Sequence, residues 1–347
     1  MPHDYSGISF NSDGVCSYCS GKQHYGISSN ERIRQMVAEK HKLKLDFERR
    51  LEQSQGKGEY DCIVPLSGGK DSCYLVYLLK TKYNLRILTF TMDNGLLNPI
   101  AKANVKQIIH RLEVDHVFVS PELDFFKRLY RYLILYTEEE VLRQKGYTNA
   151  VCFICNKPLL LGLALKEAVK REIPLVIGGL GPDQIRRYFY EIPREEIKQS
   201  WVPEWLSSEA FVADDKKYFW DPRVDAQGSD LPQVLFPFHV IEYPGPGKVM
   251  KEVVKLGFIK KNNISPRITN CHLCWLLVYL DRKRNFDPMV AEVSYRIRSG
   301  IEKRRQAAIA LELSDFCVKS GLYTNLIRRK EITAALKFMN LKIKDLI

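Results

Sequence analysis

The stretch PLSGGKDS, at positions 65–72, carries the residue types of a phosphate-binding loop. Its two glycines have no Cβ atoms, so the backbone can bend sharply and approach a ligand closely. The start of a helix offers unpaired N–H groups and the positive end of the helix dipole, which together attract an anion. Lys70 adds a positive charge, and Ser67 and Ser72 add hydroxyl donors. The stretch therefore predicts a cradle for phosphate.

The residues around this loop predict a strand before it and a helix after it. The run YDCIVPL, which ends at Leu66, is short and apolar, as is typical of a buried parallel strand. Apolar residues from Cys73 to Leu79 recur at helical spacing. The lysine follows the second glycine directly, so the loop differs from the Walker pattern. A plain Gly-Gly turn is the alternative, but the complete hexapeptide SGGKDS in this setting argues against it.

SGGKDS between a strand and a helix resembles the PP-loop of the ATP pyrophosphatases. That superfamily includes GMP and NAD synthetases, tRNA thiolases and several amidotransferases. The resemblance implies a doubly wound α/β domain that binds ATP with Mg²⁺ and releases pyrophosphate. It places the nucleotide on the loop residues Pro65, Ser67, Gly68, Gly69, Lys70, Asp71 and Ser72.

Three Cys-x-x-Cys pairs offer a second kind of chemistry: Cys16 with Cys19, Cys152 with Cys155, and Cys271 with Cys274. This spacing lets two thiolates bind one tetrahedral ion, and two pairs complete a structural zinc site. His24 could add a ligand beside the first pair. The alternative is that each pair fills apolar space at a helix start. The nine cysteines of the chain thus indicate metal binding, redox chemistry or burial.

Further candidate residues lie near the predicted ends of strands. Asp71 follows the loop lysine, and its carboxylate could hold Mg²⁺ on the phosphates or complement the helix dipole. Asp93 ends the second predicted strand, at the edge where ligands bind in such sheets. Asp183 follows the fourth strand and could contact a metal ion or the substrate. Gly178 and Gly179 could let the backbone approach the nucleotide. Lys70, Asp71 and Asp183 are the predicted catalytic residues.

Other residues have a structural explanation beside a functional one. Arg186 and Arg187 could bind anions, although arginines of this kind are usually solvated surface residues. His239 and Lys248 are further candidates close to an irregular segment. Three tryptophans are expected to pack that segment rather than stack on a base: Trp201, Trp205 and Trp220.

The length, composition and net charge of the chain limit the classes of protein to which it can belong. The chain has 347 residues, of which 45% are hydrophobic and 27% charged, as in an ordinary globular protein. No apolar run approaches membrane-spanning length, and MPHDYSGISF lacks the features of a signal peptide, so a cytoplasmic protein without membrane insertion is expected. The net charge of +12 suits either nucleic acid or a polyanionic small substrate. Basic residues are interspersed with acids, so charge does not decide between these partners.

The order of predicted elements indicates an α/β fold with a doubly wound parallel sheet. A long helix over 29–54 precedes strands near 61–66, 85–93, 115–120 and 173–179, with helices between them. A loop over 146–155 precedes the helix 156–172. Residues 181–236 lack periodicity and suggest an irregular insertion, and the remainder is mostly helical. We expect an N-terminal cysteine segment and helix over 1–58, an ATP pyrophosphatase core over 59–190, and a substrate or partner region over 191–347.

Four segments together resemble the N-acetyl sugar amidotransferase family, which makes acetamidino-type groups on surface sugars. They are GISFNSDGVCSYC, YDCIVPLSGGKDSCYLVYLLK, TFTMDNGLLNPIAKANVKQII and VCFICNKPLLLGLALKEAVKREIPLVIGG. The resemblance covers residues 7–185 well and the rest loosely. The chain departs from the family by starting at MPHDY, without an additional Cys-x-x-Cys. It also has LGPDQ where a Glu-Asn or Glu-Ser pair is usual.

This resemblance implies transfer of AMP from ATP to a carbonyl or amide oxygen of an N-acetyl sugar, followed by displacement of AMP by ammonia. No glutaminase is recognisable in the chain, so a separate glutaminase subunit is the expected partner.

A rival hypothesis is sulfur transfer. The tRNA thiolases of the PP-loop superfamily resemble this chain in their cysteines, three of which hold an iron–sulfur cluster. Cys152, Cys155 and one of Cys271 or Cys274 could do the same here, or the cysteine pairs could carry a persulfide, with tRNA or a small molecule as the acceptor. A third hypothesis, a regulatory nucleotide-binding protein without turnover, is disfavoured by the intact loop.

Overall fold

The computed structural model describes residues 9–14, 30–136, 150–181, 190–261, 270–283, 293, 296–297 and 300–346. The chain divides into two compact units. The sheet unit comprises Glu39–Tyr132 and Val151–Asn270, and the helical unit comprises Met1–Ala38, Leu133–Ala150 and Cys271–Ile347. The three-part division expected from the order of predicted elements stays a prediction.

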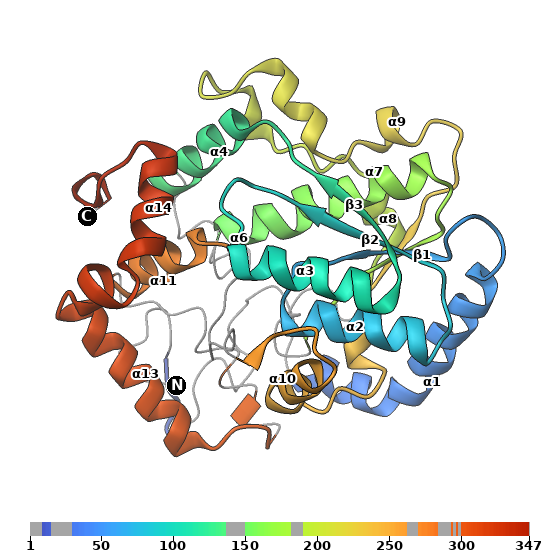
Figure 1. The fold of residues 1–347 in the computed structure, drawn as a ribbon, viewed down its shortest axis with the longest axis horizontal. Coiled ribbons are helices and arrows are strands. Elements are labelled where there is room, and N and C mark those ends of the chain that lie inside the picture. The colour runs from blue at the N-terminus through green and yellow to red at the C-terminus, as the bar shows by residue number, and fades with distance from the viewer. Residues whose placement is uncertain are drawn as a thin grey trace. The chain divides into compact units, whose positions relative to one another are not determined.

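Six strands form one sheet in the sheet unit, in the order β3-β2-β1-β4-β6-β5. Figure 1 labels three of them, β1, β2 and β3. All neighbouring strands are parallel except the pair β5 and β6. The strands are β1 (Cys62–Pro65), β2 (Ile87–Met92), β3 (Asp115–Val119), β4 (Leu175–Ile177), β5 (Glu191–Ile192) and β6 (Gln233–Leu235). The predicted α/β fold with a mostly parallel sheet and a helical C-terminal part is confirmed.

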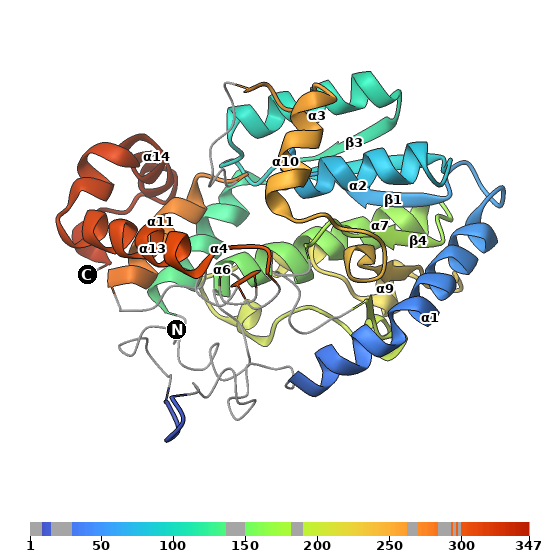
Figure 2. The ribbon, with the colours of Figure 1, turned by 90° about the horizontal axis from the view of Figure 1, so that it is seen from below.

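Helices lie on both faces of this sheet. Figure 2 shows α2 and α3 on one face and α7 on the opposite face. Among the described residues, the helices that begin before the helical C-terminal part are α1 (Asn30–Ser54), α2 (Lys70–Thr81), α3 (Pro99–Leu112), α4 (Leu123–Leu135), α6 (Ala150–Ile154), α7 (Gly162–Lys170), α8 (Arg194–Ile197), α9 (Pro222–Asp225) and α10 (Pro246–Lys255). Because the order β1-β2-β3 runs to one side of β1 and β4 lies on the other, the chain reverses direction across the sheet at β1. Ligands bind at such a switch point, at the carboxyl ends of the strands.

The main core of the sheet unit explains why these elements form. Every residue of β1 and β2 is buried, as expected for central parallel strands that are covered on both faces. The apolar face of α2 packs on them together with residues of α1 and α10. Contributors from the three helices are Phe47, Leu51, Leu75, Val76, Leu79, Val249 and Val253.

Two expectations about local structure are wrong. Part of the segment expected to be irregular supplies β5 and β6, which are too short for a period-2 pattern to show in the sequence. The loop expected over 146–155 is helical from Ala150, because α6 continues through a π-helical segment, Cys155–Leu161, into α7. Pro158 lies inside this segment. Proline argues for a helix boundary, but a π-helical turn accommodates its missing N–H.

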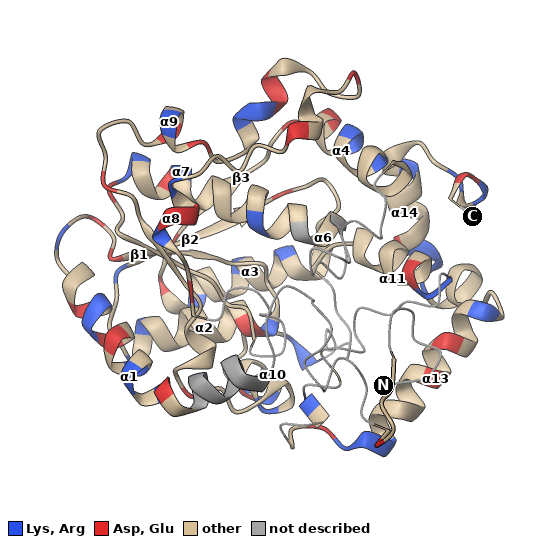
Figure 3. Ribbon diagram, turned by 180° about the vertical axis from the view of Figure 1, so that it is seen from behind, with Lys and Arg blue, Asp and Glu red and all other residues tan. Residues whose placement is uncertain are grey.

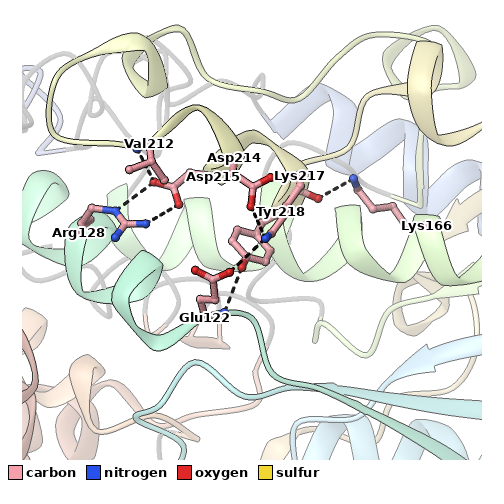
Figure 4. A network of polar contacts seen from close by, with 8 residues as sticks. All are labelled: Glu122, Arg128, Lys166, Val212, Asp214, Asp215, Lys217 and Tyr218. Atoms are coloured by element: carbon pink, nitrogen blue, oxygen red, sulfur yellow. Dashed lines mark hydrogen bonds and ion pairs between the residues drawn. The ribbon is translucent and has the colours of Figure 1, made fainter.

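The insertion is held to the sheet unit by aromatic packing and by a network of polar contacts. Trp220 is fully buried, Trp201 is nearly so, and Trp205 stacks on Tyr132, so the tryptophans pack the insertion as predicted. Figure 4 shows Arg128 of α4 facing the buried carboxylate of Asp215, with distances of 2.6 and 3.1 Å. These contacts fix residues 204–225, whose helical segments are only four to six residues long.

The helical unit is built around α11 (Leu273–Lys283), which contacts α13 (Arg304–Lys319) and α14 (Arg329–Met339). The guanidinium of Arg328 lies 3.7 Å from the ring centre of Trp275, a cation–π contact. No helix within the described residues is both long enough and apolar enough to cross a membrane.

Charges of both signs are mixed along the helices (Figure 3). In α1, Asp46 pairs with Arg49 at 2.5 Å and with Arg50 at 2.7 Å. Arg50 also reaches Glu191 of β5 at 2.6 Å. Arg49 and Arg50 of this helix are therefore paired with nearby carboxylates.

Candidate active site

The loop that follows β1 lies at the carboxyl edge of the parallel strands. The N–H of Leu66 donates to the carbonyl of Phe90 at 2.7 Å, and Thr91 Oγ1 donates to the carbonyl of Leu66 at 2.5 Å. Pro65, the last residue of β1, is in register with Phe90. The start of the predicted phosphate cradle is thus anchored to β2, beside the switch point of the sheet.

Gly68 is required by the backbone of this loop. Its φ is +74°, a left-handed conformation that L side chains rarely adopt. A Cβ atom at Gly68 would lie 2.2 Å from the carbonyl oxygen of Ala101 in α3. Asn104 of α3, which is buried, donates from Nδ2 to the Gly68 carbonyl at 2.9 Å. The loop is therefore shaped by α3. The role of Asn104 was not inferred from sequence, although a polar residue on a buried helix face was a signal.

The start of α2 has no side-chain cap. Gly69 is its N-cap residue and provides no side-chain cap for the first turn. Ser72 Oγ accepts from the N–H of Ser67 at 3.3 Å, contacts Ser67 Oγ at 3.1 Å, and donates to the Gly69 carbonyl at 3.2 Å. The two serines thus stabilise the loop itself. An uncapped helix start beside a lysine is a site where an anion is stabilised.

Lys70 and Asp71 form an ion pair at the first turn of α2. Lys70 Nζ lies 2.5 Å from Asp71 Oδ2, and Tyr243 Oη donates to Asp71 Oδ1 at 2.6 Å. Asp71 is held from two sides, and the side chain of Lys70 is only 25% exposed. A phosphate ligand would compete with Asp71 for Lys70. Tyr243 was not a candidate in the sequence.

Asp93 follows β2 and is paired with Lys102. Asp93 Oδ2 lies 2.6 Å from Lys102 Nζ, and Asp93 Oδ1 accepts from the N–H of Gly95 at 3.0 Å. Carboxylate oxygens suit Mg²⁺, which also keeps water and phosphate ligands. Asp71 and Asp93 have the right chemistry for that ion, but each is partnered by a lysine in this form. Their roles toward Mg²⁺ and ATP stay predictions.

Gly178 and Gly179 follow β4 at the same edge of the sheet. A Cβ atom at Gly178 would lie 2.6 Å from the ring of Phe236, and one at Gly179 would lie 2.9 Å from Cα of Ser72. The lack of a side chain at these two glycines thus leaves room for Phe236 and Ser72. Gly179 brings the end of β4 against the start of α2, whereas contact of either glycine with a nucleotide stays a prediction.

Cys152 and Cys155 lie within the helix that begins at Ala150, rather than ahead of it. Both are partly exposed, and Cys155 Sγ lies 3.6 Å from the hydroxyl of Tyr130. Residues three apart in a helix share a face, so the two thiols can act on one group. The π-helical segment begins at Cys155, and such segments are frequent at functional sites.

Cys271 and Cys274 form a turn in the helical unit, where the N–H of Cys274 donates to the carbonyl of Cys271 at 3.2 Å. His272, between them, has its pKa lowered by burial, an effect opposed by the charge of Glu331. A Cys-x-x-Cys pair can supply at most two ligands of a four-ligand site, so metal binding by these cysteines stays a prediction. Within the described ranges, no group of three or more His, Cys, Asp and Glu side chains converges as a metal site.

The remaining candidates divide into two sets. Cys62 and Cys73 flank the loop and are fully buried; burial and the nearby charge of Asp71 raise the pKa of Cys73 to about 12, so its thiol stays protonated. The other set lies outside the described residues: Asp183, Arg186, Arg187, His24, Cys16 and Cys19.

Comparison with known proteins gives partial matches. No protein-family model matches the chain. A probable sulfurtransferase of Methanocaldococcus jannaschii is 32% identical over 122 residues, which cover 32% of this chain and 34% of that protein. An uncharacterised protein of the same organism is 35% identical over 63 residues, which cover 18% of this chain and 23% of that protein. The chain thus spans about a third or less of the curated relatives it matches.

Solved structures also give partial matches. NMN synthetase from Francisella tularensis aligns with a TM-score of 0.38 and 12% identity, covering 88% of this chain and 97% of that one. The U34-tRNA thiolase NcsA from Methanococcus maripaludis, solved with its [4Fe-4S] cluster, aligns with a TM-score of 0.35 and 11% identity, covering 82% and 79%.

Proposed function

We propose that the chain is an adenylating ATP pyrophosphatase of the PP-loop type. The observation that carries this proposal is the uncapped start of α2, with Gly68 in a left-handed conformation and Lys70 beside it, at the carboxyl edge of β1. A substrate oxygen attacks the α-phosphorus of ATP, and the bond from that phosphorus to the bridging oxygen breaks. The pyrophosphate leaves on the loop, where Lys70 and the helix N–H groups neutralise its charge.

In the second step, AMP is displaced from the substrate carbon that bears the adenylated oxygen. A nucleophile attacks this carbon, and the bond from carbon to the AMP oxygen breaks. We propose sulfur as the incoming atom, with tRNA or a small molecule as the acceptor. The sequence similarity of part of the chain to a probable sulfurtransferase supports this choice. The two partly exposed thiols on one helix, Cys152 and Cys155, support it as well.

Amidation of an N-acetyl sugar is the second candidate. Its support is the resemblance of four segments in the sequence to the sugar amidotransferases. In this case ammonia attacks the activated carbon, and a separate glutaminase supplies it. Both candidates share the adenylation step. Zinc or an iron–sulfur cluster on the cysteine pairs stays a prediction, and no step above is assigned to either.

Adenylation is tested by identifying the two products formed from ATP. The protein with Mg²⁺, ATP and an acceptor should release AMP and pyrophosphate, and Lys70→Ala should reduce this release by about 100-fold or more, the effect of removing one charge-stabilising group. Lys80→Ala, near the other end of α2, is the matched control and should retain full release. Stoichiometric ADP and phosphate would contradict the proposal.

The incoming atom is tested on anaerobically purified protein. Incorporation of labelled sulfide into bulk tRNA or a small acceptor, dependent on ATP, is expected. Ammonium-dependent AMP release with an N-acetyl sugar, and none with sulfide, would instead favour the amidotransferase.

A further inference from the structure

The carboxamide of Asn270 lies directly over the phosphate loop. A Cβ atom at Gly69 would be 3.1 Å from Asn270 Oδ1 and 3.2 Å from Nδ2, so both ends of the carboxamide are equally near this residue. Gly69 has a φ of −83°, which any residue adopts. The missing side chain at this position therefore makes room for Asn270 rather than relieving the backbone.

The main chain of Asn270 is fixed in place. Its carbonyl accepts from the N–H of Asn98 at 2.8 Å. Asn98 is the N-cap of α3, and its side chain accepts from the N–H of Ile100 at 2.9 Å. Asn270 is thus tied to the loop that follows β2 while its side chain faces the loop that follows β1.

The oxygen of the Asn270 side chain, by contrast, has no hydrogen-bond partner in the part of the chain that the structure describes. Asn270 Oδ1 is buried, and no donor reaches it from the described residues. A buried polar atom left without a hydrogen bond costs about 1–3 kcal/mol, and such atoms are rare in folded proteins. An acceptor oxygen cannot bind a phosphate oxygen, so this position suits a phosphate ligand only when the carboxamide is turned to place Nδ2 there.

We propose that Asn270 is a phosphate-binding residue that closes the cradle over Gly69 and contacts the pyrophosphate part of ATP; this inference rests on the proposed function. The two ends of a carboxamide are nearly the same size, so a half-turn presents either the oxygen or the two N–H donors to the loop. The donors bind a phosphate oxygen without adding charge. Lys70 then remains the charged contact, and Asn270 sets the position of the anion.

The test compares ligands with and without pyrophosphate. Binding of ATP, inorganic pyrophosphate and AMP to the full chain is measured by calorimetry for the wild type, Asn270→Ala and Asn270→Asp. Asn270→Ala should weaken ATP and pyrophosphate about tenfold or more, the size of one hydrogen bond to a charged group, and leave AMP unchanged. Asn270→Asp keeps the shape but adds negative charge, so it should weaken both further. Gln199→Ala, an exposed amide in the same unit, is the control.

A purely structural role predicts a different pattern. In that case the variants would lower the midpoint of thermal unfolding and weaken AMP and pyrophosphate equally, or weaken neither, and the inference would be wrong. Gly69→Ala examines the same contact from the loop. A methyl group at this position displaces the carboxamide of Asn270. Gly69→Ala should therefore weaken pyrophosphate binding in the wild type but cause no further loss of affinity when Asn270 is already alanine. If the wild type bound neither ATP nor pyrophosphate, the proposed function itself would fail.

Discussion

Tyr243 and Asp71 are 172 residues apart in the chain, yet the tyrosine hydroxyl donates to the aspartate at 2.6 Å. The second oxygen of Asp71 accepts from Lys70. In the proposed function Lys70 turns to a phosphate ligand, which would leave Asp71 with one of these two partners. Tyr243 then keeps the carboxylate at the first turn of α2.

Replacing Tyr243 by phenylalanine should therefore impair turnover more than folding. The variant lacks one hydrogen bond to a carboxylate, so the rate of AMP formation should fall about tenfold. The thermal midpoint should change little, because Lys70 still pairs with Asp71 in the protein without ligand. Tyr136→Phe, at a 69% exposed tyrosine, is the control. An unchanged rate in Tyr243→Phe would show that Asp71 needs no second partner.

Gly68→Ala should disrupt the loop. The left-handed conformation costs an L residue about 1–2 kcal/mol, and the added methyl group meets the backbone of Ala101 at 2.2 Å. We expect the free energy of unfolding to fall by about 2 kcal/mol or more, with loss of pyrophosphate release. Denaturant titration and an assay of AMP measure the two effects.

Gly247→Ala is the matched control for this substitution. Gly247 lies in α10, and a Cβ atom there has no neighbour within 4 Å. Alanine favours a helix over glycine, so this change should alter the free energy of unfolding by less than about 1 kcal/mol. Equal effects at the two glycines would refute the proposed strain at Gly68.

The sequence was sufficient for the loop and for the parallel sheet because both are encoded locally. SGGKDS sits between a β-rich apolar run and a helical pattern, and the alternation of strands and helices continues to β4. The strands β5 and β6 were missed, since two or three residues carry no periodicity.

The partners of the loop could not be predicted in this way. Tyr243, Asn104 and Asn270 reach the loop from distant positions in the chain, and no motif in the sequence assigns them to it. Only the fold brings them together. Asn104 alone gave a signal, as a polar residue on the buried face of a helix.

The insertion should depend for its stability on Arg128. This side chain donates two hydrogen bonds to the buried Asp215, which also accepts from the N–H of Val212 (Figure 4). Arg128→Ala leaves a buried carboxylate without its counter-charge, so the free energy of unfolding should fall by about 2–4 kcal/mol. Denaturant titration followed by tryptophan fluorescence measures it, because Trp201 and Trp220 are buried in this part.

An exposed lysine provides the comparison. Lys217 pairs with Asp214 and with Glu122 in the same network, but all three side chains are largely exposed. Lys217→Ala should therefore cost less than about 0.5 kcal/mol. A larger loss at Lys217 than at Arg128 would contradict the view that the buried pair anchors the insertion.

His239, a candidate from the sequence, should act on stability at acid pH. Burial, and secondarily the charge of Lys40, lowers the pKa of His239 to about 3, whereas an unfolded histidine has a pKa near 6.5. The folded protein thus keeps this ring neutral. Below about pH 6.5 the unfolded chain takes up a proton that the folded chain does not, so stability falls as pH is lowered toward 3.

His239→Gln isolates this contribution, because the carboxylates and other histidines titrate alike in both proteins. Between pH 6 and 4, the free energy of unfolding of the wild type should decline more steeply than that of the variant, by up to about 1.4 kcal/mol per pH unit. Urea titrations at half-unit steps measure the two slopes. A ring with a pKa near 3 is too weak a base for proton transfer at neutral pH. Parallel slopes would mean that His239 takes up its proton in the folded protein as well. His239 would then again be a candidate for proton transfer.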